Sequence, residues 1–269
     1  MNEVDDHELA RVLAEEAGRL LLDLRQQLTA DGATAAELRD EGDRRSNELI
    51  LGRLADARPA DAVLSEEGRG AEGPEGAAAR AGADRVWIID PLDGTREFSE
   101  PPRADWAVHV ALVRDGKPVA GAVALPAQGR TLATDPPAPA PAAPPARPRI
   151  IVSRTRPPAV ATHLAEALDG ELVAMGSAGA KAAAVVLGAA DVYPHSGGQY
   201  EWDSCAPVAV AEAAGLWTSR IDGSPLVYNN PDPYLPDLLV CHRSLAERVR
   251  RAIDSFGPET ADTADTAER

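Results

Sequence analysis

Residues 87–98 read WIIDPLDGTREF, and this stretch decides the fold. Together with Val86 it begins as an apolar run of the kind that forms a buried strand. The run ends at Asp90 and Asp93, with a proline, a glycine and a threonine around them. Two carboxylates at the end of a buried strand repel each other unless a cation offsets their charge. We therefore expect a cation site at the end of this strand.

The turn DPLDGT at 90–95 has residues suited to both a metal and an anion. Pro91 fixes its own φ angle, and Gly94 lets the backbone approach a ligand closely. Thr95 is expected to begin a helix, where free N–H groups form an anion site. Hard oxygen ligands without a nearby histidine favour Mg²⁺ over Zn²⁺. For this motif alone, an ordinary Asx turn that caps a helix remains the alternative.

Composition and charge limit the classes of function. The chain has 269 residues, of which 44% are hydrophobic and 26% charged, as in globular proteins of one large or two moderate domains. A net charge of −16 argues against nucleic acid as a partner and fits a site where divalent cations bring in a phosphate. The two cysteines predict reduced thiols instead of a disulfide framework.

The N-terminal segment predicts no secretory signal, and the apolar runs predict no membrane span. MNEVDDHELARVLAEE has neither a basic n-region nor an apolar h-region. No apolar run approaches the ~20 residues that cross a bilayer. We therefore expect a cytoplasmic protein without membrane contact. The histidines show no metal-ligand spacing, and we interpret all of them as structural or surface residues: His7, His109, His163, His195 and His242.

Hydrophobic periodicity predicts a mixed α/β chain. Apolar steps of three and four predict a helix from Asp5 or Asp6 to about Leu28, and a second helix from Asp40–Asp43 to Arg58. Further helices are expected over 158–168, 180–187, 204–214 and 245–253. Short strands are expected over 63–64, 86–89, 105–113, 118–125, 149–152, 171–174, 191–195, 226–228 and 238–241.

Proline density predicts the domain boundary. Residues 136–148, PPAPAPAAPPARP, hold too many prolines for a helix or a central strand, and we interpret them as a stiff linker or loop. This divides the chain into an N-terminal α+β subdomain at 1–135 and a C-terminal α/β subdomain at 149–256. The stretch 68–83 is expected to be a surface loop, and the polar tail 257–269 to be disordered.

Three long motifs resemble the inositol monophosphatase superfamily of magnesium-dependent, lithium-sensitive phosphatases. VLSEE at 63–67 is similar to the family's first acidic segment, WIIDPLDGTREF to its central motif, and EWDSCAPVAVAEAAG at 201–215 to its C-terminal motif. They lie in the family's order and spacing, and the likeness extends to about residue 255. The ending of DPLDGT with a basic residue, Glu97 and Phe98 most resembles the CysQ branch, 3′(2′),5′-bisphosphate nucleotidases of high-GC bacteria.

This resemblance implies a layered αβαβα sugar-phosphatase fold with the active site between two subdomains. It implies an enzyme of sulfate assimilation that removes the 3′-phosphate from adenosine 3′,5′-bisphosphate, with 3′-phosphoadenosine 5′-phosphosulfate as a further candidate substrate. It also implies two to three Mg²⁺ ions per site and inhibition by Li⁺. Water would attack the phosphorus in line, so no Cys or His nucleophile motif is expected. Both monomers and homodimers occur among such proteins.

The family's residue roles carry over to the matching positions. The metal ligands would be Glu66, Asp90, the Leu92 carbonyl, Asp93 and Asp203. A hydrogen-bonded pair of Asp43 and Thr95, together with Glu66, would orient and deprotonate the attacking water. Substrate contacts are expected from Gly94, Thr95, Arg96, Gly176, Ser177, Ala178, Lys181 and Glu201. Helix capping and ordinary surface exposure are the alternatives for several of these.

Other functions remain open from the sequence alone. A broader phosphatase acting on inositol 1-phosphate or fructose 1,6-bisphosphate would use the same metal site. An inactive phosphosugar- or nucleotide-binding regulator is expected to lack one of the key acidic residues or Thr95, and all of them are present. A cation-binding module without activity would not explain the glycine and threonine beside the acids. The nucleotidase is therefore the favoured hypothesis.

Overall fold

The structure is a computed structural model that describes residues 5–68 and 73–256. Its helices are α1 (Asp6–Ala30), α2 (Ala35–Ala57), α3 (Gly73–Ala81), α4 (Thr95–Phe98), α5 (Ala159–Leu168), α6 (Ala178–Val186), α7 (Glu201–Ala213) and α8 (Ala246–Asp254). Its strands are β1 (Ala62–Ser65), β2 (Val86–Asp93), β3 (Ala107–Arg114), β4 (Lys117–Leu125), β5 (Arg130–Ala133), β6 (Arg149–Ser153), β7 (Glu171–Met175), β8 (Val192–Tyr200), β9 (Trp217–Ser219) and β10 (Tyr234–Cys241).

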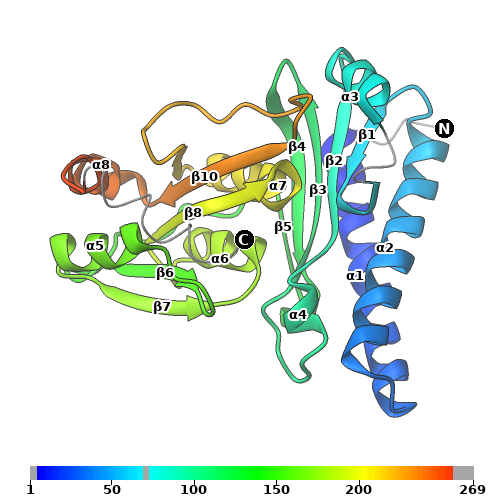
Figure 1. The fold of residues 1–269 in the computed structure, drawn as a ribbon, viewed down its shortest axis with the longest axis horizontal. Helices are drawn as coiled ribbons and strands as arrows, with labels where there is room; N and C mark the ends of the chain where they lie inside the picture. The colour runs from blue at the N-terminus through cyan, green and yellow to red at the C-terminus, as the bar shows by residue number, and fades with distance from the viewer. Residues whose placement is uncertain (1–4, 69–72, 257–269) are drawn as a thin grey trace.

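These elements stack in five alternating layers, which confirms the expected αβαβα arrangement. The pair α1 and α2 covers the outer face of the first sheet, and α5 and α8 cover the outer face of the second (Figure 1). Helices α6 and α7 lie between the two sheets (Figure 1). Because each sheet is covered by helices on both faces, its strands can be apolar on both faces.

The first sheet brings two acidic motifs to one edge. Its strand order is β1-β2-β3-β4-β5, with β1 parallel to β2 and the other pairs antiparallel. The last residue of β1, Ser65, pairs with Ile89 of β2. Glu66, which follows β1, is therefore placed beside Asp90 of β2. All eight residues of β2 are buried.

The second sheet has the order β7-β6-β8-β10-β9. Strand β6 is parallel to β7 and β8, and β10 is antiparallel to β8 and β9. One buried apolar cluster contains Leu64 and Ile88 of the first sheet, Ala182 of α6, Trp202 of α7 and Leu238 of β10. The two halves are thus joined by a shared core through the middle helices, and the side chains near the start of α6 and α7 are held against the first sheet.

Local capping explains where the first two helices begin. Asp5 caps α1 by accepting a hydrogen bond from the Glu8 amide at 2.8 Å. Helix α2 begins at Ala35, several residues before the predicted start at Asp40–Asp43. The reason is a capping box between Thr34 and Glu37, in which each side chain accepts a hydrogen bond from the other's backbone amide.

Other predictions of local structure were wrong or incomplete. The glycine-rich stretch 68–83 was expected to be a loop, but alanines stabilise α3 over Gly73–Ala81, while 69–72 lie outside the described residues. The predicted strand 226–228 is irregular, with one backbone hydrogen bond from Tyr228 to Gly116. The short strands β5 and β9 were not predicted.

The proline-rich segment and the chain end complete the comparison with the predictions. Between β5 and β6 the structure has no helix or strand, only one isolated bridge that joins Ala133 and Pro137. The expected disordered tail, 257–269, lies outside the described residues. Among the residues that the structure describes, no helix is long and apolar enough to cross a membrane.

Candidate active site

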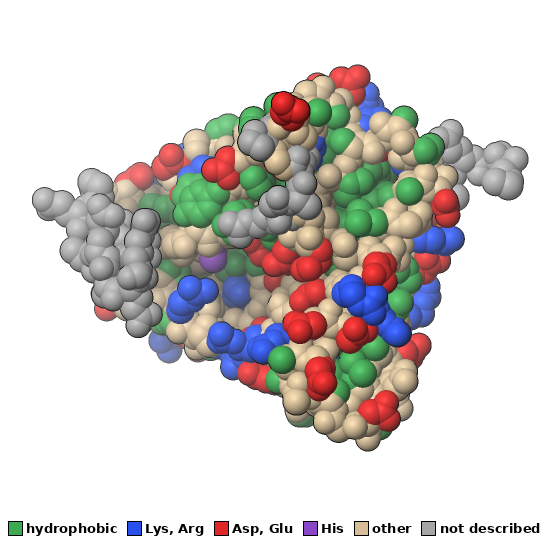
Figure 2. Space-filling model, turned by 45° about the vertical axis from the view of Figure 1, so that its right-hand side comes forward, with side chains coloured by type: hydrophobic (Ala, Val, Ile, Leu, Met, Phe, Trp, Pro, Cys, Tyr) green, Lys and Arg blue, Asp and Glu red, His purple; other side chains and the backbone are tan. Residues whose placement is uncertain are grey.

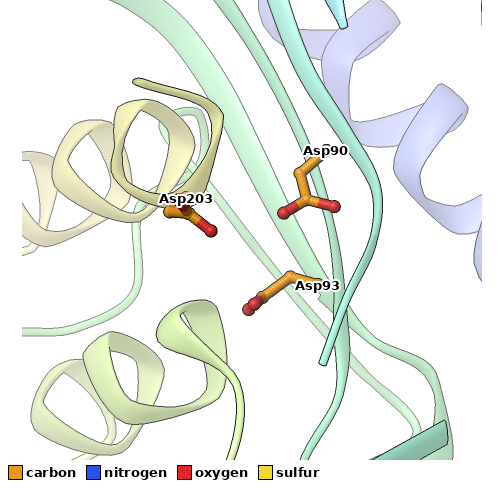
Figure 3. A group of neighbouring side chains, drawn as sticks. All are labelled: Asp90, Asp93 and Asp203. Atoms are coloured by element: carbon orange, nitrogen blue, oxygen red, sulfur yellow. The ribbon is translucent and has the colours of Figure 1, made fainter. Parts of the chain in front are cut away.

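Three carboxylates from two distant motifs converge at the edge of the first sheet. Asp90 and Asp93 come from the end of β2, and Asp203 comes from the first turn of α7 (Figure 3). One oxygen from each side chain lies within 4.8 Å of the others. Their carboxylates point toward a common space between β2 and α7 (Figure 3). The WIID and EWD motifs therefore meet at this edge of the sheet.

Glu66 joins this group from the end of β1. It lines the same cavity as the three aspartates. Burial, followed by repulsion from Asp203 and Glu67, raises the pKa of Glu66 to about 7. The predicted set of side-chain ligands is therefore brought together, and Leu92 also lines the cavity.

The carboxylates are electrostatically frustrated as they stand. Burial, together with the charges of Glu66 and Asp93, raises the pKa of Asp90 well above its ordinary value. Burial and the charge of Asp93 likewise raise the pKa of Asp203 to about 6. Such a cluster keeps all its protons off only if a cation replaces them. An all-oxygen donor set of this kind fits a hard divalent cation such as Mg²⁺.

Asp93 differs from its neighbours because its carboxylate is hydrogen-bonded. It accepts the Ser177 hydroxyl and the backbone amides of Ala178 at 3.1 Å and Gly179 at 2.6 Å. Burial alone would raise its pKa, but contacts with His109 and Ser177 lower it to about 2. Asp93 therefore faces the first turn of α6 and links the two halves of the molecule at the site.

The glycine and threonine of DPLDGT shape the backbone beside the carboxylates. Gly94 has φ +84°, a left-handed conformation that strains other residues. A Cβ at Gly94 would also lie 2.9 Å from the Ser177 Cβ, so the turn can approach α6 only with glycine. Thr95 begins α4 as predicted. Gly94 and Thr95 both line the cavity.

The cavity has a volume of about 380 Å³ and lies between the two halves. We call Glu66, Asp90, Asp93 and Asp203 its acidic wall. The basic wall consists of Arg96, Arg154, Arg156 and Lys181. Figure 2 shows acidic side chains gathered across the middle of one face of the molecule, with basic ones beside them.

The members of the basic wall differ in their pairing. Arg154 is bound by Glu97 at 2.7 Å and Glu100 at 2.9 Å. Arg96 and Arg156 are exposed, and within the described parts of the chain no carboxylate lies within ion-pair distance of either. The wall thus presents unneutralised positive charge on a strongly acidic protein, as a site for an anionic ligand would.

Lys181 is the buried member of the basic wall. Its side chain is only 5% exposed, and its ammonium donates to the Ser177 carbonyl at 2.6 Å. The nitrogen also lies 5.4 Å from the centre of the Tyr193 ring. Burial lowers its pKa, against the opposing effect of nearby acids led by Asp93. An ammonium has three donors, so Lys181 retains donors for a ligand in the cavity.

Two predicted residues are not placed as expected. The described side chains of Asp43 and Thr95 form no hydrogen bond with each other. Burial and the charges of Glu67 and Glu66 raise the pKa of Asp43 to about 8. Glu201 does not reach the cavity: it is fully buried, and its carboxylate accepts hydrogen bonds from Asn229 and Asn230. The position of Glu201 at the start of α7 directs its carboxylate toward the loop at 229–230.

His109, which was predicted to be structural or on the surface, is a buried residue that lies against the acidic wall. It is fully buried on β3, with Nε2 3.3 Å from the Asp93 carboxylate. Burial would lower its pKa, but the contact with Asp93 raises it. His109 lies directly opposite Asp90 in the pairing of β2 with β3, which the spacing of histidines along the chain does not reveal.

The five-layered fold and the acidic wall together define the class of metal-dependent phosphatases with a sugar-phosphatase fold. More particularly, the chain belongs to the inositol monophosphatase family, whose profile matches residues 4–255. This confirms the family resemblance of the three motifs.

Individual relatives sharpen the comparison. The chain is 51% identical to a "3′-phosphoadenosine 5′-phosphate phosphatase" of Mycobacterium bovis, over 88% of this chain and 89% of the relative. It is 32% identical to "3′(2′),5′-bisphosphate nucleotidase CysQ" of Escherichia coli, over 70% of this chain and 78% of the relative. Among solved structures, CysQ from Bacteroides thetaiotaomicron is similar with a TM-score of 0.72 and 27% identity, covering 87% of this chain and 96% of that one.

Proposed function

We propose that this protein is a Mg²⁺-dependent phosphatase that removes the 3′-phosphate from adenosine 3′,5′-bisphosphate. The observation that carries the proposal is the cavity itself, where carboxylates from two distant motifs face unpaired basic residues. The identity of 51% with phosphatases named for this substrate supports it. A single phosphate would be matched by the metal site, while a second phosphate explains the additional positive charge.

The acidic wall is proposed to hold two to three Mg²⁺ ions. Glu66, Asp90, Asp93, Asp203 and the Leu92 carbonyl would be the protein ligands. When bound, the ions neutralise charge on the phosphoryl group and make water a better nucleophile at neutral pH. The raised pKa values of Glu66 and Asp203 support this assignment, since a cation would relieve the repulsion that causes them.

The chain's own groups then orient the reactants. We propose that Glu66, which lines the cavity beside the other carboxylates, accepts a proton from the attacking water. We propose that Asp43 and Thr95 help to orient this water. The backbone N–H groups of Gly94 and Thr95 would hold the phosphoryl oxygens. No side chain of the cavity needs to form a covalent bond with the phosphorus.

The basic wall is proposed to select the substrate. Arg96, Arg156 and Lys181 would bind a second phosphate on the same ribose, and Gly176–Ala178 would lie against the sugar. The exposed guanidinium groups of Arg96 and Arg156 suit a phosphate because two of their N–H groups can bind one anion together. Glu201 is left out of the proposed substrate contacts because its carboxylate is already satisfied by the 229–230 loop.

The test is a comparison of three phosphate esters on one preparation. Phosphate release from adenosine 3′,5′-bisphosphate, inositol 1-phosphate and fructose 1,6-bisphosphate would be measured with Mg²⁺ and with a chelator. The proposal expects the highest kcat/KM for the nucleotide and no turnover without metal. A higher kcat/KM for either sugar phosphate would replace the nucleotidase with the broader phosphatase. No release from any of the three would favour a regulator that binds without catalysis.

A further inference from the structure

His109 occupies a position that no metal-ligand assignment uses. Its ring is fully buried in the middle of β3. Nδ1 lies 3.0 Å from the Trp202 carbonyl, to which it must donate because a carbonyl only accepts. Nε2 lies 3.3 Å from Oδ2 of Asp93. The imidazole therefore touches one metal ligand directly and the backbone immediately before another, Asp203.

The two segments that the ring touches also pack against each other in the shared core, which contains Ile88 of β2 and Trp202 of α7. Asp93 ends β2 and Asp203 lies in the first turn of α7, and no strand pairing sets the distance between them. The strand that carries His109 is paired to β2 along most of its length. At the site itself, the planar ring of His109 places one nitrogen on each segment and so bridges Asp93 and the backbone next to Asp203.

The surrounding structure holds the ring in this orientation. A Cβ at Gly179 would lie 1.9 Å from Nε2 of His109, so this position of α6 accommodates the ring only as glycine. The Gly179 amide meanwhile donates to the same Asp93 oxygen that faces the ring, at 2.6 Å. His109, Gly179 and Asp93 therefore form one tightly packed contact, in which the ring has little freedom to turn.

We propose that His109 is a positioning residue that sets the separation of Asp93 and Asp203 and thereby the affinity of the site for Mg²⁺. The inference rests on the proposed function in that these two aspartates hold the metal. Groups that orient metal ligands typically contribute 10–100-fold to metal affinity or activity. Among the hydrogen bonds and ion pairs of the described residues, only those of His109 link Asp93 with the backbone of Trp202.

The experiment measures Mg²⁺ binding by calorimetry on the full chain without substrate, alongside circular dichroism and thermal unfolding in a chelator. His109→Leu removes both polar contacts and should raise the Kd for Mg²⁺ by roughly 10–100-fold. His109→Gln places an amide near the Nε2 position and should restore most of the affinity. His109→Asn reaches only the Nδ1 position and should bind more weakly than His109→Gln.

The control is His163→Leu, which removes a histidine that hydrogen-bonds to Ala252 and Ser255 on the outer side of the second sheet. It should bind Mg²⁺ as the parent does. Equal affinity in the parent and all three folded His109 variants would overturn the inference while leaving the function intact. Three variants that are all unfolded would overturn it too, by showing that the ring stabilises the fold instead. A parent that binds no Mg²⁺ would instead reject the proposed function.

Discussion

Asp90 and Asp93 of the acidic wall are buried, whereas Arg96 and Arg156 of the basic wall are exposed. Asp90 and Asp93 are 1% and 7% exposed, and Asp93 accepts three hydrogen bonds from the start of α6. Arg96 and Arg156 are exposed, and no carboxylate among the described residues pairs with them. Asp90 and Asp93 are short side chains built into a buried strand and have little freedom to move, whereas Arg96 and Arg156 carry their charges on long, exposed side chains that can adapt.

This difference indicates that catalysis and substrate recognition depend on different walls. Chemistry on a phosphoryl group needs groups held in fixed geometry, so we expect it at the acidic wall. Recognition of a second anion tolerates movement, since a guanidinium can follow a phosphate over a short range. Changes in the acidic wall should therefore act mainly on turnover, and changes in the basic wall on the choice and binding of substrate.

The largest effect is expected from Asp93→Asn. The substitution keeps the shape but removes a charge from the metal site, so kcat should fall by more than about 100-fold, the upper end for groups that merely support a ligand. The measurement is phosphate release with circular dichroism as a check of folding. Asp191→Asn is the matched control, because Asp191 is equally buried but pairs with Arg149 in the second half. Turnover of Asp93→Asn at the parent rate would exclude Asp93 as a ligand.

A smaller effect, on KM instead of kcat, is expected from Arg156→Gln. One charged hydrogen bond contributes about 1.5–3 kcal/mol, and exposure places Arg156 at the lower end, so kcat/KM for adenosine 3′,5′-bisphosphate should fall by about 10-fold. The loss should appear in KM and should be smaller for adenosine 3′-phosphate. Arg248→Gln removes the same charge from the exposed face of α8 and serves as control. Equal losses for both substrates would mean that Arg156 does not recognise the second phosphate.

The stability of the metal-free protein should depend on pH through the acidic wall. The pKa of Glu66 is raised from 4.5 to about 7, and that of Asp203 from 3.8 to about 6. The folded state thus holds these protons more tightly than the unfolded state does. The contribution of Glu66 and Asp203 to the free energy of unfolding is therefore greatest below about pH 4 and is lost as the pH rises through about 6 to 7. Mg²⁺ should remove this slope by replacing the protons.

Urea unfolding between about pH 5 and pH 8, in a chelator and in Mg²⁺, measures this dependence. The pKa of Asp93 is lowered to about 2, so Asp93 has the opposite sign, and its contribution is lost only as the pH falls from about 3.8 toward 2. If the urea midpoint in chelator does not fall between about pH 5 and pH 8, the proposed crowding of carboxylates is contradicted.

The smallest effect on catalysis is expected from Glu201→Gln, although it lies only two residues from Asp203. Its carboxylate accepts the amides of Asn229 at 2.6 Å and Asn230 at 2.8 Å. An amide side chain cannot accept all of these bonds, so unfolding should become easier by about 1–3 kcal/mol. KM for the nucleotide should stay unchanged. An increased KM at unchanged stability would restore Glu201 as a contact of the ribose.

Much of the fold was predictable because its signals are local. The apolar periodicity of α1, the Asp115–Gly116 turn between β3 and β4, and the buried run of β2 each depend on residues within a few positions of one another. The errors were local as well: a capping box at Thr34 began α2 early, and alanines formed α3 where glycines were interpreted as a loop. In both cases the prediction followed one local pattern, and neighbouring residues (the capping pair and the alanines) had the stronger effect.

The sequence by itself determined the family, the layered fold and the acidic residues that meet. All three follow from long motifs, each of which can be recognised from its own residues. The tertiary structure alone decided that His109 lies against Asp93, that Glu201 turns to the 229–230 loop, and that Arg156 faces the cavity. The physical reason is that a side chain's partner across a sheet or between two halves depends on register and packing over the whole molecule, which spacing along the chain does not encode.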